Sequence, residues 1–158
     1  MCDYSLQGLP NRLAEKGEDL KVHRFSTGTI GFTSTKELQA IEGARVVQKR
    51  SSFWSTIRDW FRIDAGPPTP AICVPPGARL MLQEIPRGLQ RDFGVGPNEE
   101  VTFTQLTAQP YNYRDAIRFN NGREVLLQKL EPGMQAVVLC LSLVEEVTEP
   151  EVALAALR

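Results

Sequence analysis

The chain has 158 residues, 42% hydrophobic and 23% charged, with 18 basic and 19 acidic side chains. This composition is typical of an ordinary soluble domain and excludes disordered and collagen-like chains. No apolar run approaches the roughly 20 residues that span a bilayer, and no secretory signal pattern is present, so we expect a cytoplasmic protein. A net charge of −1 gives no basic footprint for nucleic acid, and three widely spaced cysteines do not form a disulfide scaffold.

The first third of the chain predicts a β-hairpin followed by a short helix. Residues 20–25 alternate between apolar and polar side chains, and residues 29–33 follow after a Ser-Thr-Gly turn. Lys21 and His23 share one face of the first strand, which places His23 at the solvent or at the rim of the core. Ser34 or Thr35 can cap a helix that runs through residue 40.

Residues 51–62 predict an amphipathic helix that is rich in aromatic side chains. Both tryptophans of the chain lie in this stretch, a serine opens it, and Gly66 and Pro67 follow it. Its apolar face is formed by side chains at helical spacing and one tryptophan beside them: Phe53, Ile57, Trp60, Phe61 and Trp54. Residues 45–62 carry five basic side chains against one acidic, so their charge is +4 while the rest of the chain carries −5.

A basic helix with bulky aromatic side chains can serve three purposes. It can fill a groove on a protein partner, lie in a membrane interface, or cover one open end of a β-barrel core. Because the helix is short and no second membrane signal accompanies it, its affinity for lipid alone would be weak and reversible. We expect a helical insertion over residues 45–66 whose partner-binding side chains are Phe53, Trp54, Ile57, Arg58, Trp60 and Phe61.

The remainder of the chain predicts short strands separated by turns. A Pro-rich linker at 64–70 ends the insertion. Apolar or alternating runs then predict strands at 79–85, 100–106, 115–119, 123–130 and 135–143. The last run barely alternates, which indicates burial on both faces. Asn121-Gly122 predicts a type I′ hairpin turn. Pro76-Gly77 and Pro132-Gly133 also predict hairpin turns, with Pro first and Gly at a positive φ.

These elements predict a mainly β protein, built as a small antiparallel β-barrel or sandwich with an inserted amphipathic helix and one or two short helices. No helices separate the strands of the second half, which favours this class over a parallel sheet. We expect a single β-rich domain over residues 1–144. Four glutamates then give an acidic tail over residues 145–158.

Two cysteines and the single histidine are candidates for a metal or thiol site. Removal of the initiator Met would leave a free amine beside the thiol of Cys2, and Cys73 lies in a strand-like run that enters a turn. With His23 they could bind zinc, copper or iron, or the two cysteines could form a redox pair. None stands at the close spacing of a specific metal site, so no cofactor is predicted and unrelated structural cysteines are the alternative. Cys140 lies in the most apolar run and is expected in the core.

The sequence contains few of the residue combinations that form known catalytic sites. A Ser-His-Asp triad would need the single histidine, and no Gly-x-Ser-x-Gly turn is present. Gly94-Val95-Gly96 predicts a loop between elements rather than a phosphate-binding loop. Four carboxylates are better explained as scattered surface groups than as an acid–base pair: Asp92, Glu99, Glu100 and Asp115. We therefore favour a protein that is not an enzyme.

The opening hexapeptide, Met-Cys-Asp-Tyr-Ser-Leu, resembles the start of a group of small, uncharacterised bacterial proteins. The similarity continues patchily at Ala71-Ile72-Cys73 with Pro76-Gly77, at 115–127 and at 132–139. It implies a bacterial origin and one shared small domain, but no mechanism, and it draws attention to Cys2 and Cys73 together.

The sequence predicts a non-enzymatic binding or assembly module that docks on a larger protein partner through the helix at 51–62. The alternative is a small metal- or thiol-site protein that uses Cys2, His23 and Cys73.

Overall fold

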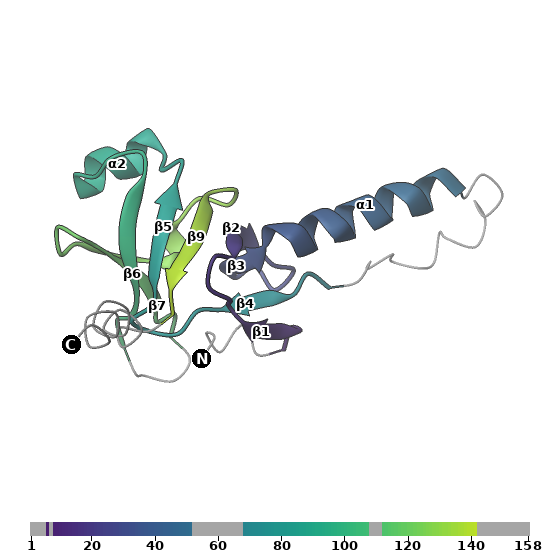
Figure 1. Ribbon diagram of the computed structural model, residues 1–158, viewed down its shortest axis with the longest axis horizontal. Coiled ribbons are helices and arrows are strands. Elements are labelled where there is room, and N and C mark those ends of the chain that lie inside the picture. The colour runs from purple at the N-terminus through teal and green to yellow at the C-terminus, as the bar shows by residue number, and fades with distance from the viewer. Residues whose placement is uncertain (1–5, 7, 52–67, 108–111, 142–158) are drawn as a thin grey trace, which may run out of the picture.

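The strands of the chain form one mixed sheet. The computed structural model describes residue 6 and residues 8–51, 68–107 and 112–141, without the side chains of 45–51. Within these residues nine strands are ordered β1-β4-β3-β2-β9-β5-β6-β7-β8. Their bounds are β1 Asn11–Leu13, β2 Asp19–Arg24, β3 Ile30–Ser34, β4 Ala71–Cys73, β5 Arg79–Gln83, β6 Glu99–Gln105, β7 Asp115–Phe119, β8 Glu124–Leu126 and β9 Gln135–Cys140. The described neighbours are antiparallel except β1 and β4, which run parallel (Figure 1).

In the residues that the structure describes, the sheet is not closed by a strand pair, although the segment that follows β8 contacts β3. No strand pair joins β1 to β8 in the described part of the chain, so the sheet is open. Directly after β8, the 3-10 turn η3 (Leu127–Lys129) contacts β3. There the side-chain amide of Gln128 accepts a hydrogen bond from the Ile30 N–H at 3.0 Å and donates one to the Ile30 carbonyl at 2.7 Å. A mainly β fold is confirmed, whereas the strand order by itself shows neither a closed barrel nor a two-sheet sandwich.

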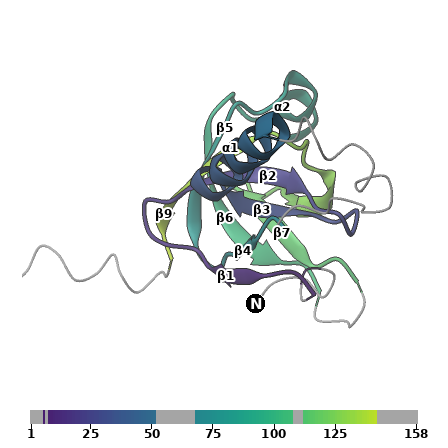
Figure 2. The same cartoon turned by 90° about the vertical axis from the view of Figure 1, so that its right-hand side faces the viewer.

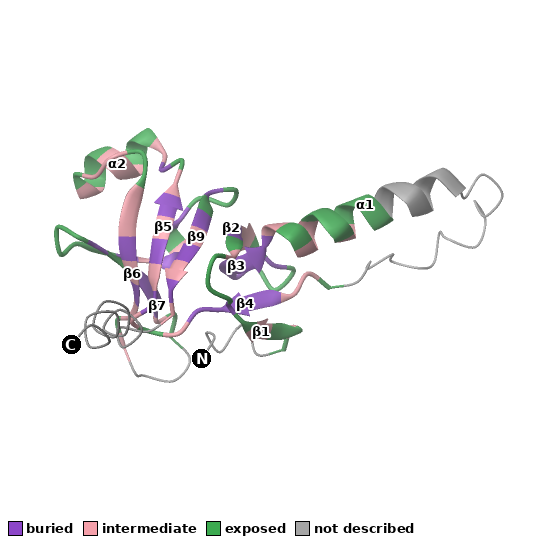
Figure 3. Ribbon diagram, viewed as in Figure 1, coloured by how far each residue is buried: buried purple, intermediate pink, exposed green. Residues whose placement is uncertain are grey.

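The main core lies on one face of the curled sheet, where buried side chains alternate with exposed or half-buried ones (Figure 3). Its largest fully buried side chains include Phe32, Phe103, Leu20, Leu80, Leu82, Ile117, Val22, Val101, Val125 and Val138. The alternation of β9 differs from the expectation: Ala136, Val138 and Cys140 are buried, whereas Val137 and Leu139 are only half-buried. One face of β9 therefore packs in the core while its other face reaches the surface.

A second, smaller cluster lies on the opposite face of the sheet. It contains the buried side chains of Leu6, Phe25, Ala71 and Cys73. Because side chains alternate along a strand, Ala71 and Cys73 point away from the main core, to which Ile72 between them belongs. Leu6, which precedes β1, is thus packed against the outer side of the sheet, with Leu9 beside the cluster.

Two hairpins close with the same kind of turn. In each, the N–H of a glycine donates to the carbonyl of the phenylalanine three residues before it: Gly28 to Phe25 and Gly122 to Phe119, both at 2.9 Å. Both glycines have positive φ, 84° and 82°, but Asn121 does not. The Asn-Gly hairpin between β7 and β8 is confirmed, and its type I′ assignment is wrong. A three-residue loop puts glycine at the left-handed position after a type I turn.

The two Pro-Gly turns are confirmed as turns but not as hairpins. Gly77 and Gly133 have φ of 92° and 104°, and a hydrogen bond of 3.1 or 3.4 Å closes each turn. Neither turn joins two paired strands. Instead the glycine N–H donates to a more distant strand, from Gly77 to Phe103 on β6 and from Gly133 to Val22 on β2, both at 2.8 Å. These contacts fix the start of β5 and of β9 against the sheet.

Helix α1 (Thr35–Ser51) begins where a helix start was predicted but continues well past residue 40. Gly43, Val46 and Val47 are weaker helix formers, but the alanine, glutamate, glutamine, lysine and arginine residues around them are good ones, and the helix continues through them. The helix leaves the sheet and extends away from it (Figures 1 and 2). The predicted helix at 51–62, apart from its first residue, lies outside the described residues, as do most of the linker and the acidic tail.

A short helix that the sequence analysis did not anticipate, α2 (Arg87–Phe93), lies between β5 and β6. Pro86 precedes it, and Gly94 ends it in the left-handed conformation with φ 64°. The loop predicted at Gly94-Val95-Gly96 is confirmed, and its first glycine ends this helix. Among the described residues, no helix has both the length and the apolar character needed to cross a bilayer.

Candidate functional site

The predicted docking helix at 51–62 follows α1, and the first half of α1, here called its base, is the part whose side chains the structure describes. Leu38 and Ile41 are half-buried near β2 and β3, whereas residues 42–44 are exposed in succession (Figure 3). Three successive exposed residues cover most of one helical turn, so the helix has left the sheet at this point. The side chains predicted to bind a partner, Phe53, Trp54, Ile57, Arg58, Trp60 and Phe61, lie outside the described residues.

An ion-pair network holds the base of α1 to the sheet. Arg12 on β1 forms a bidentate pair with Glu18 and donates from Nε to Glu37 Oε1 on α1 at 2.8 Å. The hydrogen bond to Glu18 raises the pKa of Arg12 above its usual value, against partial burial. Burial raises the pKa of Glu18, but hydrogen bonds from Arg12, the Glu15 N–H and Ser34 outweigh it, so that pKa lies below its usual value. Arg12 and Glu18 are therefore charged at neutral pH.

The structure brings His23 and Cys73 to the same face of the sheet. His23 pairs with Gly31, and Phe32 pairs with Ile72. Because β3 and β4 are antiparallel, the register continued by one residue puts Gly31 opposite Cys73. Side chains directly opposite each other on neighbouring strands share a face. His23 and Cys73 are thus in one row, two strand spacings or about 10 Å apart, with a glycine between them.

The gap above Gly31 is filled by a side chain from the N-terminal segment. A Cβ at Gly31 would lie 2.9 Å from Leu6 Cδ1 and 3.1 Å from the Phe25 ring. Leu6 is only 3% exposed, and the half-buried ring of His23 packs edge-on against Phe25 with ring centroids 5.0 Å apart. Sequence reasoning gave His23 correctly as a rim residue but missed Gly31, whose role depends on the order of three strands.

The cysteines differ in chemical state. Cys73 is 7% exposed and forms a disulfide. Cys140 is a thiol, 5% exposed in the main core, as predicted. Cys2 lies outside the described residues. Because a metal ligand must be a thiolate, Cys73 cannot bind zinc, copper or iron while its disulfide is closed. The described residues hold no group of three or more His, Cys, Asp or Glu side chains that could bind a metal ion.

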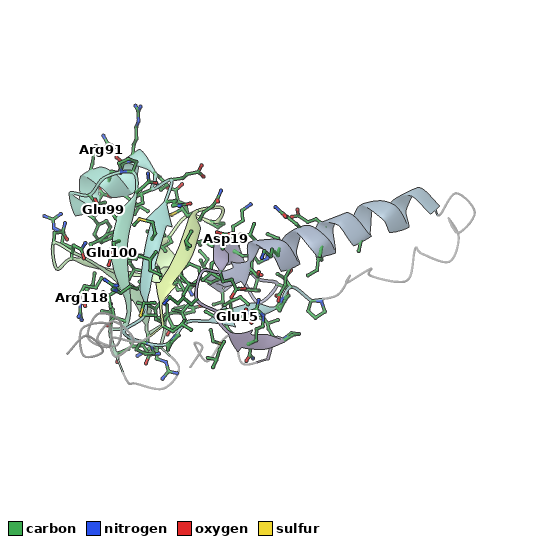
Figure 4. All side chains as sticks on the ribbon, in the orientation of Figure 1. Glu15, Asp19, Arg91, Glu99, Glu100 and Arg118 are labelled. Carbon is green, nitrogen blue, oxygen red and sulfur yellow. The ribbon has the colours of Figure 1, made fainter. Side chains whose placement is uncertain are left out.

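The carboxylates considered as an acid–base pair do not converge. Glu99 accepts from the Gly96 N–H at 2.6 Å, Glu100 pairs with Arg79 at 2.9 Å, and the buried Asp115 accepts from Gln105 at 3.0 Å. In Figure 4, Glu99 and Glu100 lie along β6, far from Glu15 and Asp19 near the base of α1. These three carboxylates therefore support loops and strand pairs.

Sequence reasoning also missed a hollow beside α2. It has a volume of about 600 Å³ and is lined by Arg87, Gln90, Arg91 and Val95. The two arginines are four residues apart, so they share one face of the helix, and both are exposed. Pro86 before the helix and Gly94 after it were the available signals.

No family model matches the chain, and no curated protein or solved structure is significantly similar to it.

Proposed function

We propose that the protein is a non-enzymatic docking module that binds a larger protein partner through residues 51–62 at the far end of α1. The observation that carries the proposal is the course of α1. Its first turns contact the sheet, and its next residues, 42–44, are exposed as the helix leads directly into the aromatic segment. A helix that begins on a domain and continues into solvent is suited to presenting a binding segment.

The base of α1 is held well enough to orient such a segment. Arg12 joins β1, Glu18 beside β2 and Glu37 in the first turn of α1 through one network. Exposed ion pairs contribute little to stability. Here, however, the Glu18 side chain is only 10% exposed and the arginine is bidentate, which restricts its geometry. The network therefore favours one direction of the helix relative to the sheet.

The chemistry of the segment favours a protein partner over nucleic acid or lipid. Trp, Tyr and Arg are the side chains enriched at the centres of protein interfaces. Trp54, Trp60 and Arg58 would supply such anchors, together with Phe53, Ile57 and Phe61. The charge of +4 over residues 45–62 suits an acidic rim on the partner. The segment alone would bind a membrane surface weakly, and the chain has no overall basic footprint.

We also infer that the sheet is a barrel-like scaffold for α1. Support comes from η3, which lies against β3, and from the Gln128 amide, which hydrogen-bonds both backbone groups of Ile30 as a paired strand would. The main core inside this curl is continuous from β2 to β8. Such a scaffold would keep the start of α1 fixed while the helix end engages a partner.

The test is a pull-down at low salt from extracts of cells that make the protein, compared between wild type and the Trp54→Ala/Trp60→Ala variant. We expect a stoichiometric protein to co-purify with wild type and to be lost from the variant, which keeps its circular dichroism and melting curve. Leu106→Ala/Tyr113→Ala is the matched control, because it removes two side chains that are 44% and 49% exposed on the described surface. If the tryptophan variant unfolds, the segment belongs to the core and the proposal fails.

A second candidate function is the small metal- or thiol-site protein at Cys2, His23 and Cys73. The disulfide at Cys73 favours the thiol form of this site. Elemental analysis of the reduced protein, prepared without an N-terminal tag, tests the metal form. Zinc, copper or iron near one equivalent, lost in Cys2→Ser, would support it, and content near zero in both proteins would exclude it.

A further inference from the structure

The hollow beside α2 plays no part in partner docking or in the cysteine site. Its volume of about 600 Å³ is typical of pockets that hold small molecules. It lies by α2 at the end of β5 and β6, well away from α1 (Figure 1). Two exposed arginines, Arg87 and Arg91, line it together with the half-buried Gln90 and Val95. The hollow therefore combines two positive charges with an apolar side chain.

The arginines of the hollow differ from the other arginines in their partners. No hydrogen bond or ion pair joins Arg87 or Arg91 to any residue that the structure describes. Every other arginine whose side chain is described forms at least one such interaction: Arg12, Arg24, Arg79, Arg114, Arg118 and Arg123. Two guanidinium groups thus face solvent beside a hollow with all their N–H donors available.

The carboxylates nearby in the sequence do not neutralise this pair. Asp92 follows Arg91 directly, but successive helical residues are about 100° apart, so Asp92 lies off the face that Arg91 and Arg87 share. Glu99 accepts a hydrogen bond from the Gly96 N–H at 2.6 Å, which supports the loop after α2. Like charges four residues apart on a helix repel each other. An anion in the hollow would remove this repulsion.

Short as it is, α2 is held in place firmly enough to fix the two arginines. Asn121, in the hairpin between β7 and β8, donates from Nδ2 to the Phe93 carbonyl at 2.8 Å. The Phe93 ring packs on Phe119 with ring centroids 5.6 Å apart. Inside the hollow, Gln90 Nε2 donates to the Ile85 carbonyl at 2.6 Å. The backbone that carries the arginines is therefore ordered before any ligand binds.

We propose that the hollow binds the phosphate group of a small phosphorylated metabolite between Arg87 and Arg91. A phosphate monoester carries close to two negative charges at neutral pH, which two guanidinium groups neutralise, whereas a carboxylate carries only one. The N–H groups of a guanidinium also match phosphate oxygens in pairs. Val95 packs against the main core and offers an apolar wall to the organic part of the ligand.

The first experiment titrates the ¹⁵N-labelled full chain with three probes and follows the backbone amide signals. Phenyl phosphate has both the phosphate and an apolar ring, inorganic phosphate lacks the ring, and benzoate places the ring on a single negative charge. We expect saturable shifts within residues 85–96, with phenyl phosphate binding at least about tenfold more tightly than benzoate and more tightly than inorganic phosphate. Shifts that do not saturate, shifts spread over the whole surface, or equal affinity for benzoate would overturn the proposal.

The second experiment removes the two arginines. Arg87→Gln/Arg91→Gln should weaken phenyl phosphate binding at least about tenfold and leave the melting curve unchanged, because both side chains are exposed and unpaired with the described residues. Arg24→Gln/Arg118→Gln is the matched control, because it removes the same charge from two other exposed arginines and should change the affinity by less than about twofold. An equal loss in both variants would show general charge attraction and overturn the site.

A charge-preserving variant tests the shape of the donors. Arg87→Lys/Arg91→Lys keeps both charges and long aliphatic stems but loses the planar forks, so phenyl phosphate should bind it about threefold or more weakly than wild type. This variant also serves if the glutamine variant does not fold. Undiminished binding by the lysine variant would contradict recognition by the arginine forks.

A phosphoserine peptide distinguishes a small ligand from a phosphorylated protein segment. We expect it to bind more weakly than phenyl phosphate, and tighter binding would overturn the assignment to a small molecule. The site makes no use of residues 51–62. Trp54→Ala/Trp60→Ala should therefore bind phenyl phosphate as wild type does, and Arg87→Gln/Arg91→Gln should keep the co-purified partner, so failure of one proposal is distinguishable from failure of the other.

Discussion

The packing of Leu6 over Gly31 makes a prediction that can be worked out from the structure. In Gly31→Ala, the new methyl group would lie 2.9 Å from Leu6 Cδ1 and 3.1 Å from the Phe25 ring, both closer than normal van der Waals contact. The backbone of Gly31 has no positive φ, so the substitution adds no backbone strain. The cost of the substitution therefore comes from the collision with these two side chains.

The expected cost of Gly31→Ala is about 1–2 kcal/mol, because overpacking of a filled site costs this much and the end of a leucine can shift partly aside. Leu6→Ala should cost about 2–3 kcal/mol, at the low end for a buried leucine, since its site is at the edge of the sheet. In the double variant the alanine methyl enters space that Leu6 has left. The two costs should then fall short of additivity by about 1 kcal/mol.

Urea unfolding of the oxidised protein at neutral pH measures this cycle. A loss of 1–2 kcal/mol should shift the midpoint by about 0.5–1 M if the slope is near 2 kcal/mol/M. Gly43→Ala is the matched control, because Gly43 is exposed in α1 with no atom within 4 Å of its added methyl. That change should stabilise the protein by about 0.5–1 kcal/mol, since alanine is the better helix former. If the free-energy costs of Gly31→Ala and Leu6→Ala were additive in the double variant, the contact of Leu6 with position 31 would be refuted.

Two other predictions concern the scaffold. Gln128→Ala should destabilise the protein by about 2 kcal/mol in urea unfolding, because it leaves both backbone groups of the buried Ile30 without their partner. The control is Gln39→Ala, which changes an exposed residue and should alter stability by less than about 0.5 kcal/mol. An equal effect of both would contradict the bridging role. The folded-state pKa of Glu18 lies below its ordinary 4.5, so its stabilising contribution is complete above that pH and is lost as pH falls towards the folded value. The stability difference between wild type and Glu18→Gln should therefore shrink between pH 5 and pH 3, and a difference that grows on acidification would contradict the assignment.

Local patterns in the sequence predicted most strands because alternation and turn chemistry act over a few residues. The hairpin at 20–33, the strand at 115–119 and both Pro-Gly turns were found in this way. The type I′ assignment failed because Asn-Gly also suits a three-residue loop, and the flanking strand register decides between the two. The end of α1 was predicted too early: the helix continues through Gly43, which weakens a helix without ending it.

The arrangement of the strands could not be derived from such patterns. β1 pairs with β4 although the two are separated by α1 and the inserted segment, and β9 lies between β2 and β5. The row of His23, Gly31 and Cys73 exists only because β4, from a distant part of the chain, pairs with the β2–β3 hairpin. Sequence reasoning therefore named two members of this row as candidates but could not predict the glycine between them or the leucine above it.

The central claim is that residues 51–62 form an accessible docking segment rather than part of the core. Trp54 and Trp60 are the two tryptophans of the chain, so tryptophan fluorescence reports on this segment alone. In the free protein we predict an emission maximum and an acrylamide quenching constant close to those of the urea-unfolded chain, with a blue shift when the co-purified partner is added. Emission that is already blue-shifted and protected from acrylamide in the free protein would contradict the claim.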